Sequence, residues 1–132
     1  MSKARITASA TVLIVADVLA AANHYRDKLG FNDIRLYGDP PYFCMAARDG
    51  HTIMLARADA PERILPNWKI QGSTSNIYFW VDDIDALYVE YQASGATIDF
   101  TLYNTPWGTR EFGVQDVDGY DITFGHVIRR AE

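Results

Sequence analysis

The chain has 132 residues, 48% of them apolar, which is enough for one folded domain with its own core and excludes a disordered chain. Its 12 basic and 17 acidic residues give a formal net charge of −5, and no basic cluster offsets it, so we expect no nucleic-acid partner. No apolar run is long enough to cross a membrane, and Asp17 interrupts the apolar stretch near the N-terminus, which argues against a signal peptide. With Cys44 as the single cysteine, we expect a cytoplasmic protein.

The first half of the chain predicts one helix and four strands. Residues 10–15 are β-branched and aliphatic, which is typical of a strand, and Asp17 then suits a helix N-cap. Apolar residues follow at helical spacing from Val18 to Leu29, and Gly30 is placed to end the helix in a left-handed conformation. Turn residues then separate three further strands, near 31–37, 42–48 and 51–57.

The second half predicts the same order of elements after a linker at 58–75 that contains two prolines. A strand at 76–81 precedes Asp83, which suits an N-cap, and an apolar helical face then runs from Ile84 to Tyr91. Gly95 is placed to end this helix. Further strands are predicted near 97–103, 109–116 and 120–126.

Two short patterns recur in the same order along the chain. The segment 15–18 resembles 81–84, which lies 66 residues later, and 49–55 resembles 118–124, which lies 69 residues later. A repeat at about half the chain length indicates a duplicated unit. We therefore predict an α+β fold in a single domain, residues 1–132. Two tandem βαβββ units, about 8–57 and 76–126, are expected to form a curved mixed sheet around a cup.

Alternation along the strand at 76–81 separates two faces. Ile77, Phe79 and Val81 are apolar and are expected to pack under the helix, whereas Asn76, Tyr78 and Trp80 carry hydrogen-bonding groups and are expected to line the concave face. Such a face suits a small molecule. The alternative is that these aromatic residues belong to the core or to a dimer interface.

The sequence resembles the vicinal-oxygen-chelate superfamily, which includes glyoxalases, bleomycin-resistance proteins and dioxygenases. The resemblance covers about residues 8–124 and is carried by Val15-Ala16-Asp17-Val18, Tyr25 and Leu29-Gly30-Phe31, then Pro106-Trp107-Gly108, Arg110-Glu111-Phe112 and Asp116-Val117-Asp118-Gly119. The last three segments are closest to the bleomycin-resistance-like branch. The resemblance implies paired βαβββ units, a homodimer, and binding sites between or alongside the subunits.

Enzymes of this family hold a divalent metal through residues on the first and fourth strand of each unit. By this resemblance, those positions are Ala10 and Met54 in the first unit and Asn76 and Thr123 in the second. Alanine has no donor atom, a thioether is a poor ligand for these metals, and the amide and hydroxyl are weak ligands. We therefore expect no metal and no other cofactor at these positions.

Other reactive side chains give weaker indications of chemistry. Arg110 and Glu111 are adjacent on a strand, so only one of them can face the cup; Glu111 there would neutralise a cation or act as a base, and Arg110 would bind a carboxylate. A surface or dimer salt bridge is the alternative for either residue. Cys44 lies between Phe43 and Met45, where packing is the expected role.

The sequence and the resemblance together favour a metal-free protein that sequesters a planar, possibly cationic drug or metabolite at or near a dimer interface, without catalytic residues. The resemblance to the bleomycin-resistance-like branch implies antibiotic resistance as one role and leaves other roles open. The predicted ligand-binding residues are Asn76, Tyr78, Trp80, Trp107, Trp68, Met54, Thr123, Glu111 and Arg110. One alternative is a metal-dependent lyase, isomerase or dioxygenase of the same superfamily. Another is an accessory module whose cup is filled by its own side chains.

Overall fold

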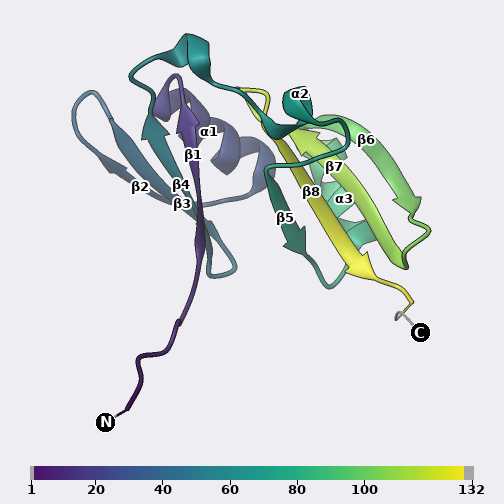
Figure 1. Cartoon of the computed structure of the whole chain (residues 1–132). Coiled ribbons are helices and arrows are strands. Elements are labelled where there is room, and N and C mark those ends of the chain that lie inside the picture. The colour runs from purple at the N-terminus through teal and green to yellow at the C-terminus, as the bar shows by residue number, and fades with distance from the viewer. Residues whose placement is uncertain (1, 130–132) are drawn as a thin grey trace.

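The first βαβββ unit forms a four-stranded mixed sheet with one helix behind it (Figure 1). The computed structural model describes residues 2–129 of the chain. The elements of this unit are β1 (Ala10–Val15), α1 (Val18–Leu29), β2 (Asp33–Tyr37), β3 (Phe43–Arg48) and β4 (His51–Arg57). The strand order is β1-β4-β3-β2, and β1 and β4 are parallel.

The second unit repeats this arrangement. Its elements are β5 (Ile77–Trp80), α3 (Ile84–Ser94), β6 (Thr97–Asn104), β7 (Thr109–Gln115) and β8 (Asp121–Val127), in the sheet order β5-β8-β7-β6. The linker contains a short 3-10 helix, Pro61–Arg63, and one turn of α-helix, α2 (Asn67–Ile70). Each unit forms its own four-stranded sheet, so the predicted α+β fold with two βαβββ units is confirmed.

Matching caps define both long helices, as the sequence predicts. The carboxylates of Asp17 and Asp83 accept hydrogen bonds of 3.0 Å from the backbone N–H groups of Ala20 and Ala86. Gly30 and Gly95 end the helices with φ angles of 74° and 78°, in the left-handed region that favours glycine. These repeated caps fix where each helix leaves its sheet.

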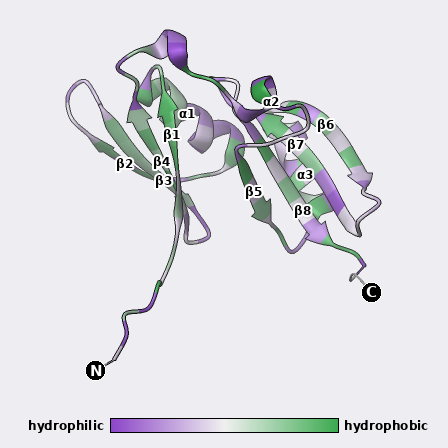
Figure 2. Cartoon of the chain, in the orientation of Figure 1, coloured by the Kyte–Doolittle hydropathy of each residue, from purple (hydrophilic) through white to green (hydrophobic). Residues whose placement is uncertain are grey.

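Each helix covers one face of its own sheet, and both helices lie behind their sheets in Figure 1. Figure 2 shows apolar residues along the strands of both units and hydrophilic residues along much of the linker and turns. The buried apolar residues form one cluster that extends through both units, including Leu13, Tyr25, Ile53, Tyr91 and Phe112. Within residues 2–129, the opposite face of each sheet carries no helix.

The segment Asp116–Gly119, one of those that carry the family resemblance, connects the second unit to the first through hydrogen bonds. Asp116 accepts a hydrogen bond of 2.6 Å from the hydroxyl of Tyr25 in α1, and Asp118 accepts one of 3.0 Å from the backbone N–H of Ala16. Burial raises the pKa of Asp116 to about 6, although hydrogen bonds from Tyr25 and from the backbone of Tyr120 and Asp118 act against this rise. This turn therefore has a structural role at the boundary between the units.

Candidate functional site

The face of β5 that is not covered by α3 carries Tyr78 and Trp80. Trp80 is 65% exposed and Tyr78 is 36% exposed, whereas Ile77 is buried. Phe79 lies on the helix side and stacks on Phe124 at a ring-centroid distance of 5.6 Å. The alternation read from the sequence is therefore observed, and the uncovered face of this sheet, called here the second open face, presents aromatic rings to the exterior.

Tyr78 lies across a neighbouring strand and contacts Glu111. In the sheet register, Tyr78 is opposite Thr123 on β8, and Glu111 on β7 is opposite Gly125 on β8. A Cβ atom at Gly125 would overlap the Tyr78 hydroxyl, so the absence of a side chain there lets the ring cross β8. The Tyr78 hydroxyl donates a hydrogen bond of 2.6 Å to Oε2 of Glu111.

Glu111 is a nearly buried carboxylate on the second open face. Its side chain is 6% exposed, and its Oε2 also accepts a hydrogen bond of 3.0 Å from the hydroxyl of Thr109. Among residues 2–129, Glu111 forms no ion pair. Burial, and then the hydrogen bond to Glu111, raise the pKa of Tyr78, so its hydroxyl remains a proton donor. The result is a carboxylate held by two neutral donors.

Arg110, the neighbour of Glu111, lies on the other side of the sheet. Its guanidinium donates to Oδ1 of Asp85 at 3.1 and 3.2 Å and to Oδ1 of Asn104 at 2.8 Å. Of the two residues that the sequence offered for the cup, Glu111 therefore lies on the open face. Arg110 forms the surface ion pair that was its alternative.

Two further aromatic rings, Phe100 and Tyr103, cover this sheet and were not among the predicted ligand-binding residues. The ring of Phe100 on β6 occupies the space above Gly113, as Tyr78 does above Gly125. Tyr103 lies 5.9 Å from Phe100, and Trp80 lies 4.6 Å from Tyr78, between ring centroids. Two glycines inside apolar strands are a signal of close approach by another group. Gly113 and Gly125 were therefore the sequence signal for this aromatic layer.

The other predicted ligand-binding residues of this half are dispersed. Thr123 is 7% exposed and opposite Tyr78 in the sheet register. The side-chain oxygen of Asn76 accepts a hydrogen bond of 2.9 Å from the backbone of Asn67, and the indole of Trp68 donates one of 2.7 Å to the carbonyl of Gly119. Trp107 lies in the exposed turn between β6 and β7. Asn76 and Trp68 thus bind the linker to the second unit.

Met54 belongs to the uncovered face of the first unit, called here the first open face. It is opposite Val12 on β1 and Met45 on β3, and the next row contains Ile14 and Tyr37. Val12 is 58% exposed and Ile14 is 54% exposed. Val12 and Ile14, two residues apart on β1, therefore form an exposed aliphatic patch along one edge of this face.

The positions that bind metal in related enzymes do not fit a metal in this chain. Ala10 offers no donor, Met54 offers a thioether among apolar residues, and the oxygen of Asn76 already accepts the hydrogen bond from Asn67. Within residues 2–129, no three His, Cys, Asp or Glu side chains are grouped as a metal site would require.

No helix in the described part of the chain is long and apolar enough to span a membrane.

Comparison with solved structures gives matches that cover nearly the whole chain. TnmS3, an antibiotic binding protein from Streptomyces sp. CB03234, is 25% identical with a TM-score of 0.67, over 96% of this chain and 99% of that chain. The bleomycin-binding protein from Streptomyces verticillus, in complex with copper(II)-bleomycin, is 22% identical with a TM-score of 0.70, over 98% of this chain and 100% of that chain.

An enzyme has a similar fold: lactoylglutathione lyase from Agrobacterium tumefaciens is 21% identical with a TM-score of 0.68, over 94% of this chain and 96% of that chain. A search of curated protein sequences gave no significant match. The family model described as Glyoxalase/Bleomycin resistance protein/Dioxygenase superfamily matches residues 7–124. Since this match covers most of the sequence, the chain belongs to the glyoxalase/bleomycin resistance protein/dioxygenase superfamily.

Proposed function

We propose that the protein binds a planar, cationic small molecule on the second open face and holds it without chemical change. The observation that carries the proposal is Glu111, which is nearly buried and has no ion-pair partner among the described residues. A buried carboxylate is costly unless a cation or several donors compensate it. Two hydroxyl groups donate to one of its oxygens, so a ligand cation next to the other would complete its environment.

The aromatic residues beside Glu111 suit a flat ligand. Tyr78 and Trp80 lie next to each other on β5, and Trp80 is largely exposed. Stacking of a ligand ring on such side chains adds about 0.5–1.5 kcal/mol per pair beyond the burial of area. A delocalised cation also gains from the negative face of each ring. The ligand would therefore place its ring on Trp80 and its charge toward Glu111.

A second copy of the chain is proposed to cover the ligand. The first open face exposes Val12 and Ile14, and an apolar patch of this kind often marks an interaction surface. If the first open face of one copy covers the second open face of another, symmetry repeats the contact and forms two closed sites. The similarity to TnmS3, an antibiotic binding protein, supports an antibiotic as the ligand, and the presence of bleomycin resistance proteins in the superfamily supports resistance as the role.

A titration with 9-aminoacridine, a planar monocation, tests the proposal. We expect it to quench the part of the tryptophan fluorescence that comes from Trp80 in the wild-type protein, and the Kd to rise at least tenfold in Glu111→Gln because the charge partner is lost. Glu62→Gln removes an exposed carboxylate from the linker and is the matched control. Equal affinity of Glu111→Gln and wild type, or equal affinity for the uncharged parent acridine at pH 8, would contradict the proposal.

Metal analysis separates binding from metal-dependent catalysis. Protein purified without chelators is expected to contain less than stoichiometric zinc, nickel, manganese or iron. The ligand is expected to be recovered unchanged after incubation with the protein. Stoichiometric metal that EDTA removes together with a catalytic activity would show an enzyme instead.

A further inference from the structure

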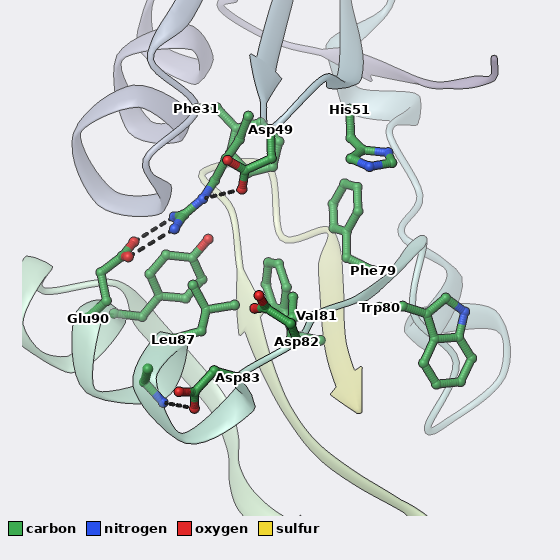
Figure 3. A pocket seen from close by; sticks show the side chains of 14 residues that line it. Phe31, Asp49, His51, Phe79, Trp80, Val81, Asp82, Asp83, Leu87 and Glu90 are labelled. Carbon is green, nitrogen blue, oxygen red and sulfur yellow. Dashed lines mark hydrogen bonds and ion pairs between the residues drawn. The ribbon is translucent and has the colours of Figure 1, made fainter. Parts of the chain in front are cut away.

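A cavity of about 400 Å³ lies between the two units beside α3, and Trp80 of the second open face also borders it (Figure 3). Its walls come from the turn between β3 and β4 in the first unit and from β5 and α3 in the second. Its volume is within the usual range for small-molecule sites. Of its lining residues, Trp80 alone takes part in the proposed function.

The floor of the cavity is aromatic. Phe79 stacks on Phe124 and packs against Phe31 at a ring-centroid distance of 5.8 Å. Phe31 and Phe124 are buried, whereas Phe79 remains partly exposed although it lies on the helix-covered side of its sheet. The cavity therefore leaves part of an apolar ring without a protein partner, and a ligand with an apolar body would cover it.

The rim of the cavity is acidic. Asp49, Asp82, Asp83 and Glu90 contribute four carboxylates, and Arg48 contributes the one guanidinium. Figure 3 shows that the carboxylates come from both sides of the cavity, with Asp49 in the turn of the first unit and Asp82 two residues after the end of β5. The rim thus attracts positive charge, because its carboxylates outnumber its guanidinium.

Arg48 pairs with two of these carboxylates, Glu90 and Asp49, the latter with 3.4 Å between its Nε and Oδ2 of Asp49, and its single charge cannot compensate all four. Its guanidinium donates to both carboxylate oxygens of Glu90, at 2.5 and 2.9 Å, and to the carbonyl of Leu29 at 3.0 Å. It also lies over the ring of Tyr91, 5.9 Å from the centroid. One wall of the cavity therefore already holds a cation between a carboxylate and an aromatic ring.

Asp82 is the carboxylate with the most freedom to bind a ligand. Asp83 is used as the cap of α3, where it accepts a hydrogen bond of 3.0 Å from Ala86, while the salt bridges and hydrogen bonds found within residues 2–129 include none to Asp82. Its side chain is exposed at the rim. Together with the partly exposed Phe79, it offers a charge partner next to an apolar surface.

We propose that the cavity between the two units is a second binding site, which takes a small organic cation with an apolar or aromatic body. The cationic group would lie at the rim near Asp82 and Asp49, and the apolar body would lie on Phe79. This site does not depend on the proposed function: it shares Trp80 with the second open face, but neither Glu111 nor Tyr78.

Benzyltrimethylammonium is a suitable probe, with its uncharged analogue neopentylbenzene for comparison. We expect the probe to shift the NMR signals of the Phe79 ring and of the backbone amides of Asp49, Asp82 and Ala86. The uncharged analogue is expected to bind at least tenfold more weakly, because it cannot use the acidic rim. Equal or tighter binding of neopentylbenzene would overturn the assignment to cations.

Two variants test the location of the site. Ala86 is exposed on α3 and lines the cavity, so Ala86→Phe should fill it and raise the Kd for benzyltrimethylammonium at least tenfold without disturbing the core. Asp82→Asn should raise the Kd about three- to fivefold, as expected for one partly exposed ion pair. Asp59→Asn, in the exposed linker, carries the same charge change and should leave the Kd unchanged.

A third variant distinguishes this proposal from the proposed function. Glu111→Gln should leave benzyltrimethylammonium binding in the cavity unchanged, and Ala86→Phe should leave 9-aminoacridine binding on the second open face unchanged. If Glu111→Gln abolishes binding of benzyltrimethylammonium while Ala86→Phe has no effect, the probe binds on the open face and the cavity proposal is overturned. An absence of signal shifts around the cavity at saturating probe would overturn it as well.

Discussion

The Tyr78 hydroxyl donates a hydrogen bond of 2.6 Å to the carboxylate of Glu111 across the intervening strand β8. Tyr78→Phe keeps the ring and removes this donor, so Glu111 retains only Thr109 as a side-chain donor. We expect a loss of about 1–2 kcal/mol in the free energy of unfolding, measured with urea, because a hydrogen bond to a charged group is removed. The loss should shrink in the background of Glu111→Gln; an equal loss in both backgrounds would show that the pair is not coupled.

Gly125 makes this hydrogen bond geometrically possible. In Gly125→Ala the added methyl group would occupy the position of the Tyr78 hydroxyl and displace the ring from Glu111. We expect a destabilisation similar to that of Tyr78→Phe, about 1–2 kcal/mol by urea unfolding. Gly72→Ala is the control, because its added methyl group would contact nothing within 4 Å. Unchanged stability in Gly125→Ala would contradict the described path of the Tyr78 side chain.

Neighbouring residues on β5 should differ in their contribution to stability. Trp80→Ala removes a largely exposed ring and should change the free energy of unfolding by less than about 0.5 kcal/mol. Phe79→Ala removes a ring that packs on Phe31 and Phe124 and should cost about 2 kcal/mol or more. Thermal and urea unfolding of both variants give the measurement. The reverse order would mean that the two faces of the strand are wrongly assigned.

The pKa of Asp116, raised by burial to about 6, predicts a pH-dependent stability. In the unfolded chain an aspartate has a pKa of about 3.9, so between these two values the folded state binds more protons. Stability from this group is therefore present below about pH 4 and is lost as the pH rises through 6, by up to about 3 kcal/mol in total.

Asp116→Asn removes this titration while other carboxyl groups remain. The difference in unfolding free energy between wild type and Asp116→Asn, measured at pH 4, 5, 6 and 7, should shift in favour of the variant as the pH rises. A difference that stays constant over this range would contradict the raised pKa of Asp116.

The proposed dimer depends on the first open face. Val12→Glu places a charge in its apolar patch and should convert a dimer into a monomer in light scattering coupled to size-exclusion chromatography. Val89→Glu makes the same change at an exposed position of α3 and should leave the dimer intact. A wild-type protein that is monomeric at micromolar concentration, or a dimer that tolerates Val12→Glu, would exclude this interface.

The element order could be predicted from the sequence because the local signals are strong and repeated. Asp17 and Asp83 are N-caps, and Gly30 and Gly95 end the helices, in both cases through interactions within a few residues. The opposite orientations of Arg110 and Glu111 also followed from strand alternation alone. Only the structure identifies which of the two side chains lies on the open face, because it places Asp85 of α3 next to Arg110 on the helix side.

Two features of the candidate sites required the three-dimensional structure. The roles of Asn76 and Trp68 as partners of the linker depend on how residues 58–75 return to the second sheet. The cavity between the units combines residues from both halves, such as Asp49 and Asp82, which are distant in the chain. Strand alternation assigned Phe79 to the covered side of its sheet correctly, but it carried no information about the unfilled space beside the ring.

The two tyrosines at equivalent positions of the helices, Tyr25 and Tyr91, each donate a hydrogen bond to the opposite unit, to Asp116 and to the carbonyl of Leu29. Lys28 and Ser94 exchange hydrogen bonds across the same boundary. Each half therefore satisfies buried polar groups of the other, and neither half by itself would retain these partners. The repeated halves are thus expected to unfold in one cooperative transition, with similar hydrogen-exchange protection in α1 and α3.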